Sequence, residues 1–492
     1  MVSNVTNMKS GRIFRKRTVG SCVVLATTFT VLAVPSTLPD AKAATSTSSA
    51  VDPSSPLCIR RTSAPEVGLE FLSTIPVADR LSEVSFRSRA LNGATVKANV
   101  LLPPNYDKSG ATRYPVLYLF HGRSGDHTDW YKKGGIAAVN QQVITVMADA
   151  GTVGWHADWM GEERIGPDKG KPAPAWETFH IKELIPWVDS NYHTRGDRSA
   201  RAIAGLSMGG YGAVLYAARH PEVFGVVGSL SGQLDMLAGY PIVPLLQTYG
   251  GNLFELKLPD PCIWGDPVIE RVNWEDHSPF QLYSNLRGVK LFIAAGNGVP
   301  AKLSADPVKL GTEIIGEVAF RQMSMSLAKR LDSVGIDYKT HYTSGGHNWD
   351  LWPKQLAAFY PFMLEAANAP AASSIGVNFS YRTAEPNFSA WDWEFQVNRS
   401  VREFTYLEQV NASGLAVTGS GRLDVTTAAL YAPGGSYKVS FNGLGTQQLV
   451  ADGSGRLSFS VDLGPANLVQ QKRFDSGAMA GFRKVIVAIS QN

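Results

Sequence analysis

The sequence predicts an α/β fold followed by a second, all-β domain. Continuous apolar runs of strand length at residues 114–120, 142–148 and 289–295 are typical of strands buried on both faces of a sheet. Segments with helical spacing alternate with these runs, which predicts a mainly parallel sheet with helices on both faces. Beyond residue 375, short alternating runs separated by Gly, Pro, Asn and Asp predict a β-sandwich.

The first domain opens with alternating segments at residues 81–88 and 95–103, which predict a pair of antiparallel strands. Further strands are predicted at residues 114–120, 142–148, 199–204, 225–231, 289–295 and 337–342. Helices are predicted around residues 181–188, over 211–220 and over 318–334. A long irregular stretch rich in Pro, Gly and Trp covers residues 232–280.

A chain of 492 residues predicts two domains, but its first 43 residues are not expected to belong to either of them. A basic start, an apolar run at 19–34 and small residues at Ala41 and Ala43 predict a secretory signal peptide. A membrane anchor is the alternative, although the apolar run is shorter than the roughly 20 residues a bilayer requires. The predicted organisation is a signal peptide, a leader, the α/β-domain, a linker and the β-domain, at residues 1–43, 44–80, 81–367, 368–374 and 375–492.

The formal charge of +4 belongs to the predicted export segment, which carries six Lys or Arg and one Asp and leaves −1 on the remainder. No basic patch remains that would favour nucleic acid, and no further apolar stretch is long enough to span a membrane. Cys58 and Cys262 remain after export to an oxidising compartment. The sequence allows either a disulfide between them or two unpaired thiols.

Residues 202–212 run from an apolar strand through Gly205-Leu-Ser207-Met-Gly209 into a helix. Gly-x-Ser-x-Gly places a serine at the apex of a tight strand-to-helix turn, with its Oγ at a helix N-terminus. The motif alone is a weak signal among 47 glycines, since a tight turn with a bystander serine looks the same. The flanking strand and helix favour Ser207 as a nucleophile.

An activated serine needs a base, an acid that orients the base, and donors for an oxyanion. His347 follows the last predicted strand and two glycines, so it is the candidate base. The backbone N–H groups of Met208 and Arg123 are the candidate oxyanion donors. The acid should lie between the strand at 289–295 and His347, which leaves Asp306, Glu313, Glu317, Asp332 and Asp337.

The loop after the strand at 114–120 supplies two further candidates, His121 and Ser124, for the substrate pocket. His121 and His127 could also suggest a metal together with Asp126 and Asp129. That cluster has no recognised ligand spacing, and the chemistry of an activated serine requires neither a metal nor a cofactor.

Six stretches in one order resemble the antigen 85 type mycolyltransferases, which are serine esterases of the α/β-hydrolase fold. The resemblance covers about residues 96–362 and rests on Asp158-Trp159, Trp176-Glu-Thr-Phe179, Gly205-Leu-Ser-Met-Gly209, Gly228-Ser-Leu-Ser-Gly-Gln-Leu-Asp235, Gly296-Asn-Gly298 and His347-Asn-Trp-Asp-Leu-Trp352. In that family the acid is a glutamate eighteen residues before a glycine, which here implies Glu317 before Gly335, with Glu313 as runner-up. The resemblance implies a triad of Ser207, Glu317 and His347. It also places Trp349 beside the histidine, where it shapes the acyl site, and Trp159 is a further candidate for substrate binding.

The resemblance implies a secreted or cell-envelope acyltransferase that moves a long acyl chain to a sugar hydroxyl, such as that of trehalose or arabinogalactan. The family carries Asp-Gly-Leu-Arg where this chain has His121-Gly-Arg-Ser124, so a carboxylate and an arginine expected to face the sugar are missing. Plain carboxylester hydrolysis is therefore the alternative. A non-catalytic protein that binds host matrix or cell wall is a third reading, and Tyr381, Trp391 and Trp393 form either a sugar platform or core.

Overall fold

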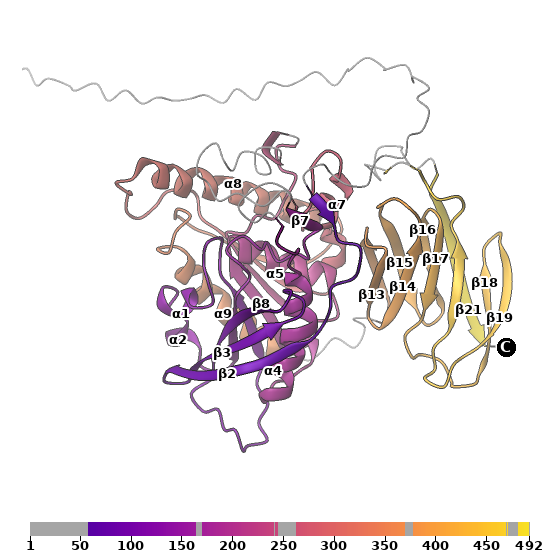
Figure 1. Ribbon diagram of the computed structural model, residues 1–492, viewed down its shortest axis with the longest axis horizontal. Coiled ribbons are helices and arrows are strands. Elements are labelled where there is room, and N and C mark those ends of the chain that lie inside the picture. Colours follow the sequence, from indigo (N-terminus) through magenta and orange to yellow (C-terminus); the bar gives the residue numbers. More distant parts are fainter. Residues whose placement is uncertain are drawn as a thin grey trace, which may run out of the picture. The chain divides into compact units, whose positions relative to one another are not determined.

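The structure is a computed structural model that describes residues 58–163, 170–240, 242–244, 262–369, 377–468, 470 and 481–491 (Figure 1). The predicted signal peptide at 1–43 lies outside these residues, as do the first part of the leader and most of the predicted linker. In the described part of the chain, no helix combines the length and the apolar character that crossing a bilayer requires.

Among the described residues, nine strands form one mixed sheet in the order β11-β10-β9-β8-β5-β6-β4-β3-β2. Neighbours from β6 to β11 are parallel, whereas β2, β3 and β4 pair antiparallel and β4 joins β6 antiparallel. The strands are β2 (Leu69–Ala78), β3 (Leu81–Ser88), β4 (Ala94–Leu101), β5 (Val116–Phe120), β6 (Ile144–Ala148), β8 (Arg201–Leu206), β9 (Val226–Leu230), β10 (Lys290–Ala295) and β11 (Tyr338–Tyr342). The predicted antiparallel pair and parallel core are both confirmed.

Strand β2 lies inside the segment expected to precede the sheet, and it pairs with β3 as an edge strand. Most of its side chains are exposed, so its sequence lacks the apolar signal of the buried strands. A separate two-stranded ladder joins β1 (Cys58–Arg60) to β7 (Gly161–Glu163), and Cys58 forms a disulfide with Cys262.

Helices cover both faces of the nine-stranded sheet (Figure 1). On one face Leu215 of α5 packs in the same cluster as Ile203 and Val227, and on the other Phe359 of α9 packs with Phe292. The helical segments are α1 (Asp129–Lys132), α2 (Ile136–Val139), α3 (Trp176–Thr178), η1 (Phe179–Leu184), α4 (Ile185–Asn191), η2 (Arg198–Ala200), α5 (Met208–Arg219), α7 (Arg271–Asp276), η4 (Tyr283–Leu286), α8 (Pro307–Asp332) and α9 (Trp352–Asn368). This architecture confirms the α/β-hydrolase fold, and α8 starts eleven residues before the helix predicted at 318–334.

The described residues beyond 377 form strands and loops only. Six strands form a sheet in the order β12-β15-β16-β21-β18-β19, and four form another in the order β13-β14-β17-β20. The strands are β12 (Phe379–Thr383), β13 (Asn387–Ala390), β14 (Trp393–Asn398), β15 (Thr405–Asn411), β16 (Gly414–Gly419), β17 (Arg422–Thr426), β18 (Ser436–Phe441), β19 (Gly445–Val450), β20 (Ser458–Asp462) and β21 (Arg483–Gln491). Their buried side chains form one cluster, so the two sheets pack against each other as a sandwich.

The aromatic residues considered as a sugar platform belong to the packed interior instead. Trp393 is 1% exposed, and Tyr381 is buried with its hydroxyl donating to the carbonyl of Arg219. Trp391 packs against the same cluster, and the Arg198 guanidinium lies over its ring. Of the two alternatives, a sugar platform and the core, these contacts support the core.

Candidate active site

Ser207 occupies the sharp turn between β8 and α5. Its backbone has φ of 52° and ψ of −116°, which is strained for any residue with a Cβ. The glycines two positions away permit this turn, since a Cβ on Gly205 would lie 2.5 Å from the carbonyl carbon of Gly209. A Cβ on Gly209 would lie 2.5 Å from the carbonyl oxygen of His121. The motif therefore encodes a steric requirement as well as the predicted nucleophile.

The structure brings Ser207, His347 and Glu317 together from three separate elements. Nε2 of His347 lies 2.9 Å from Oγ of Ser207, and Nδ1 of His347 lies 2.7 Å from Oε2 of Glu317. His347 stands in the loop between β11 and α9, whereas Glu317 stands on α8. With Nδ1–H donating to the carboxylate, Nε2 is free to accept the serine proton.

Glu317 is fully buried, and both of its carboxylate oxygens are hydrogen-bonded. Oε1 accepts from the hydroxyl of Ser231 at 2.6 Å and from the N–H of Gly296, while Oε2 faces His347. A buried carboxylate with this many donors is held in one orientation. Sequence reasoning did not assign Ser231 and Gly296, although both lie in stretches that carry the family resemblance.

Glu313, the runner-up for the acid, lies one turn earlier on α8. Its backbone carbonyl accepts a hydrogen bond from the N–H of His347 at 2.8 Å. It therefore supports the histidine loop through its main chain, and the carboxylate bonded to the imidazole is that of Glu317.

The two predicted oxyanion donors flank Ser207. Met208 is the first residue of α5, so its N–H has no acceptor within the helix. The loop after β5 runs directly beside Ser207, because a Cβ on Gly122 would lie 3.4 Å from Cβ of Ser207. Arg123 follows in this loop, and burial of its side chain lowers the pKa of its guanidinium.

His121 holds this loop in place rather than lining a pocket with its side chain. It is 1% exposed, and its Nε2 accepts from the N–H of Ala150 at 2.9 Å. Nδ1 then carries the proton and donates to the carbonyl of Gly122 at 2.7 Å. Burial lowers the pKa of His121, which favours this neutral form. Ser124 is exposed, and its N–H donates to the carbonyl of Thr152.

His127 anchors the far end of the same loop. Its Nδ1 lies 2.9 Å from Asp149 and its Nε2 lies 2.9 Å from Glu83. Burial alone would lower the pKa of His127, but the hydrogen bonds and charges of the two carboxylates raise it overall. The described residues contain no group of three or more His, Cys, Asp or Glu placed to hold a metal.

The predicted tryptophans lie in two different places. Trp349 packs edge-to-face on Trp352, whose ring in turn contacts the ring of His347 with centroids 5.0 Å apart. The ring of Phe320 also contacts the ring of His347, with centroids 4.8 Å apart. Phe320 and Trp352 are therefore aromatic neighbours of the imidazole. Trp159 is 7% exposed, and it lines a cavity at the end of α5 opposite to Ser207.

The family model described as "Putative esterase" matches residues 88–363, more than half of the chain. This chain belongs to that esterase family. The match confirms the expected kinship with serine esterases, and its range ends before β12. The C-terminal β region therefore lies outside the matched part of this esterase-family chain.

Individual relatives support the same placement. Esterase Rv1288 of Mycobacterium tuberculosis is 32% identical over 274 residues, which is 54% of this chain and 56% of that protein. The mycolyltransferase Ag85B of Mycobacterium leprae is 28% identical over 276 residues, which is 52% of this chain and 76% of that protein. The expected resemblance to antigen 85 proteins is thus confirmed, and the chain spans about half the length of the first of these relatives.

Two solved structures are also similar. A ferulic acid esterase matches 58% of this chain and 98% of its own, with 23% identity and a TM-score of 0.40. MPT51 of Mycobacterium tuberculosis matches 56% of this chain and 95% of its own, with 22% identity and a TM-score of 0.42.

Proposed function

We propose that this esterase-family protein is a secreted serine acyltransferase that moves a long acyl chain through a seryl ester to a sugar hydroxyl, such as that of trehalose. One observation supports the chemistry above all: the continuous contact from Ser207 Oγ through His347 to the buried carboxylate of Glu317. These residues act as nucleophile, base and orienting acid. The predicted export segment supports a location outside the cytoplasm.

The reaction proceeds in two half-reactions. Oγ of Ser207 attacks the ester carbonyl as His347 Nε2 takes its proton, and the N–H groups of Met208 and Arg123 bind the oxyanion. The carbonyl re-forms, the alcohol leaves with the proton from His347, and the acyl group stays on Ser207. A second alcohol then loses its proton to His347 and attacks the seryl ester, which releases the new ester and returns the proton to Ser207.

Hydrolysis of carboxylic esters by the same residues is the second candidate, with water as the acceptor. Two observations favour it. The first relative above, Rv1288, is named an esterase. The loop after β5 also has His121 and Ser124 where the mycolyltransferase pattern has a carboxylate and an arginine. In this loop His121 is buried and bonded to the backbone, so its imidazole offers no group to a sugar.

Incubation of the full chain with trehalose monomycolate and with p-nitrophenyl butyrate distinguishes these candidates. Transfer predicts that trehalose dimycolate forms and that added trehalose diverts acyl groups from water. Rapid ester turnover without dimycolate would exclude transfer and retain hydrolysis. Ser207→Ala is the control for both reactions and should abolish them. If the protein were non-catalytic, ester turnover would be absent already in the wild type, and a fluorophosphonate would fail to label it.

A further inference from the structure

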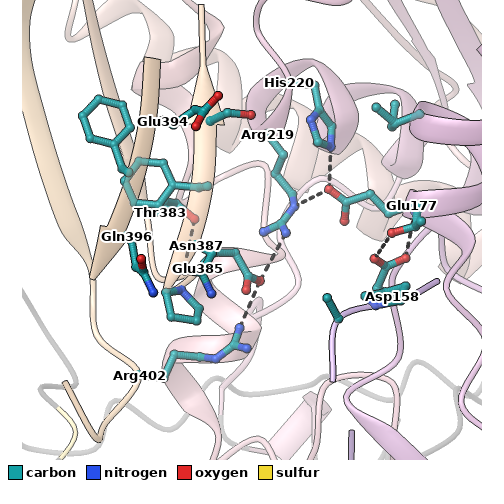
Figure 2. Close-up of a pocket in the computed structure, with 18 of the residues that line it drawn as sticks. Asp158, Glu177, Arg219, His220, Thr383, Glu385, Asn387, Glu394, Gln396 and Arg402 are labelled. Atoms are coloured by element: carbon teal, nitrogen blue, oxygen red, sulfur yellow. Dashed lines mark hydrogen bonds and ion pairs between the residues drawn. The ribbon is translucent and has the colours of Figure 1, made fainter. Parts of the chain in front are cut away.

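The cavity that Trp159 lines lies at the end of α5 opposite to Ser207, with a volume of about 1080 Å³ (Figure 2). Helix α5 runs from Met208 to Arg219, so at 1.5 Å per residue its two ends are about 18 Å apart. Arg219 lines the cavity, whereas Ser207 does not. A ligand held here is therefore separate from the acyl group on the nucleophile.

One wall of this cavity is the outer face of the sheet β13-β14-β17-β20. The strand register aligns Asn387 with Gln396, Gln396 with Asp424, and Asp424 with Ser460, which makes one polar row across four strands. The neighbouring row consists of Ser389, Glu394, Thr426 and Ser458. Both rows line the cavity. The residues between them, such as Val425, are buried in the sandwich because side chains alternate along a strand.

This sheet face presents hydroxyl, amide and carboxylate groups at regular spacing. Directly opposed side chains on neighbouring strands lie about 5 Å apart, a distance comparable to the spacing of hydroxyl groups along a sugar ring or between neighbouring rings. Asn387, Gln396 and Glu394 are exposed, so these groups can exchange water for the hydroxyls of a ligand.

The opposite wall is charged but internally paired. Arg219 donates to Glu177 at 2.8 Å and to Glu385 at 3.2 Å, as Figure 2 shows. His220 lies 2.7 Å from Glu177, and Arg402 donates to Glu385 at 3.2 Å. Because Arg219 and Arg402 already have carboxylate partners, this wall offers hydrogen-bonding groups without a strong field of one sign. It favours neither a polyanion nor a polycation.

The size and chemistry together restrict the ligand. Typical small-molecule pockets measure about 300–1,000 Å³ and are mainly apolar, whereas this cavity is at least as large and carries polar side chains on two of its walls beside apolar ones. These walls fit an uncharged ligand that is rich in hydroxyl groups and longer than a single sugar ring. We propose that the cavity between α5 and the sheet β13-β14-β17-β20 binds a neutral oligosaccharide chain, which anchors the protein to a glycan at a distance from Ser207.

Calorimetric titration of the full wild-type chain with neutral gluco-, manno-, xylo-, arabino- and galacto-oligosaccharides tests this proposal, with oligogalacturonate as the acidic comparison. These probes carry no acyl ester, so binding is read without turnover. We expect at least one neutral series to bind. Gln396→Ala and Asn387→Ala should each weaken it about tenfold, the effect of losing one or two hydrogen bonds. Both variants should keep the wild-type melting temperature and ester turnover.

Gln447→Ala is the matched control, because Gln447 is an exposed glutamine on β19 in the other sheet. It should leave sugar affinity unchanged. The proposal is overturned if no neutral series binds at millimolar sugar, if oligogalacturonate binds more tightly, or if Gln396→Ala binds as the wild type does. The last result would place the sugar elsewhere, for instance at an acceptor site beside Ser207. Loss of ester turnover alone would affect only the proposed function.

Discussion

The carboxylate of Glu317 joins three parts of the α/β-domain at one point. Its Oε2 lies 2.7 Å from Nδ1 of His347, while Oε1 accepts from Ser231, which follows β9, and from Gly296, which follows β10. The orientation of His347 toward Ser207 thus depends on the carboxyl ends of two neighbouring parallel strands. This is the edge of an open α/β sheet at which functional groups gather.

Glu317→Gln is expected to lower kcat by about 10²–10⁴-fold, since an amide cannot stabilise the imidazolium that forms during attack. Glu313→Gln is the matched control one turn earlier, because Glu313 contacts the histidine loop through its backbone carbonyl. Hydrolysis of p-nitrophenyl butyrate measures both. Equal losses in the two variants would contradict the assignment of Glu317 as the acid.

His127 should make stability depend on pH. Its pKa is raised in the folded protein, so the protonated imidazole stabilises the fold fully below the unfolded value near 6.5. That contribution is lost as pH rises through the higher folded-state pKa. The groups facing it are Glu83 and Asp149, with Lys97 bonded to Glu83.

Thermal melts above about pH 6.5 should therefore show a decline in the wild type that is weaker in His127→Gln. His341→Gln, on the edge strand β11, controls for loss of a histidine. A variant at position 127 with the wild-type pH dependence would show that the two carboxylates do not hold a charged imidazole.

The effect of Asp158→Asn on the free energy of unfolding should become progressively more stabilising as pH rises. Burial, followed by the charge of Glu177, raises the pKa of Asp158 to about 6. The neutral carboxyl therefore favours the folded state below the unfolded value, and this advantage is lost as pH rises through about 6. Above that pH the wild type carries a buried charge that asparagine lacks, worth at most about 3 kcal/mol. Urea unfolding at acidic and alkaline pH measures the change, and a difference that stays constant with pH would refute it.

Arg219→Met is expected to destabilise the protein by about 3–5 kcal/mol, because it leaves the buried carboxylates of Glu177 and Asp276 without their cation. Arg402→Met is the comparison. Arg402 is more exposed and pairs with Glu385 alone among the described carboxylates, so its loss should cost less than about 2 kcal/mol. Urea unfolding at neutral pH measures both free energies. Similar costs would mean that Arg219 does not organise the buried charges.

Local patterns determined much of this protein from its sequence alone. Apolar runs of strand length predict the parallel core because a strand buried on both faces needs no alternation, and β5, β6 and β10 bear this out. The turn at Ser207 was equally readable, since Gly205 lies against Gly209 within the same five-residue motif. Edge strand β2 was missed because its exposed side chains impose no pattern.

Contacts between distant segments were decided only by the tertiary structure. The sequence left five acids open, and the family resemblance selected Glu317. Only the packing of α8 against the loops after β9 and β10 shows one carboxylate bonded to His347, Ser231 and Gly296. Likewise, His121 was expected beside the substrate, yet backbone groups from two loops use both of its ring nitrogens. Apart from Gly122, which is next to His121, these partners lie tens of residues away, so no local periodicity records them. Burial rather than sequence spacing determines which polar groups must pair.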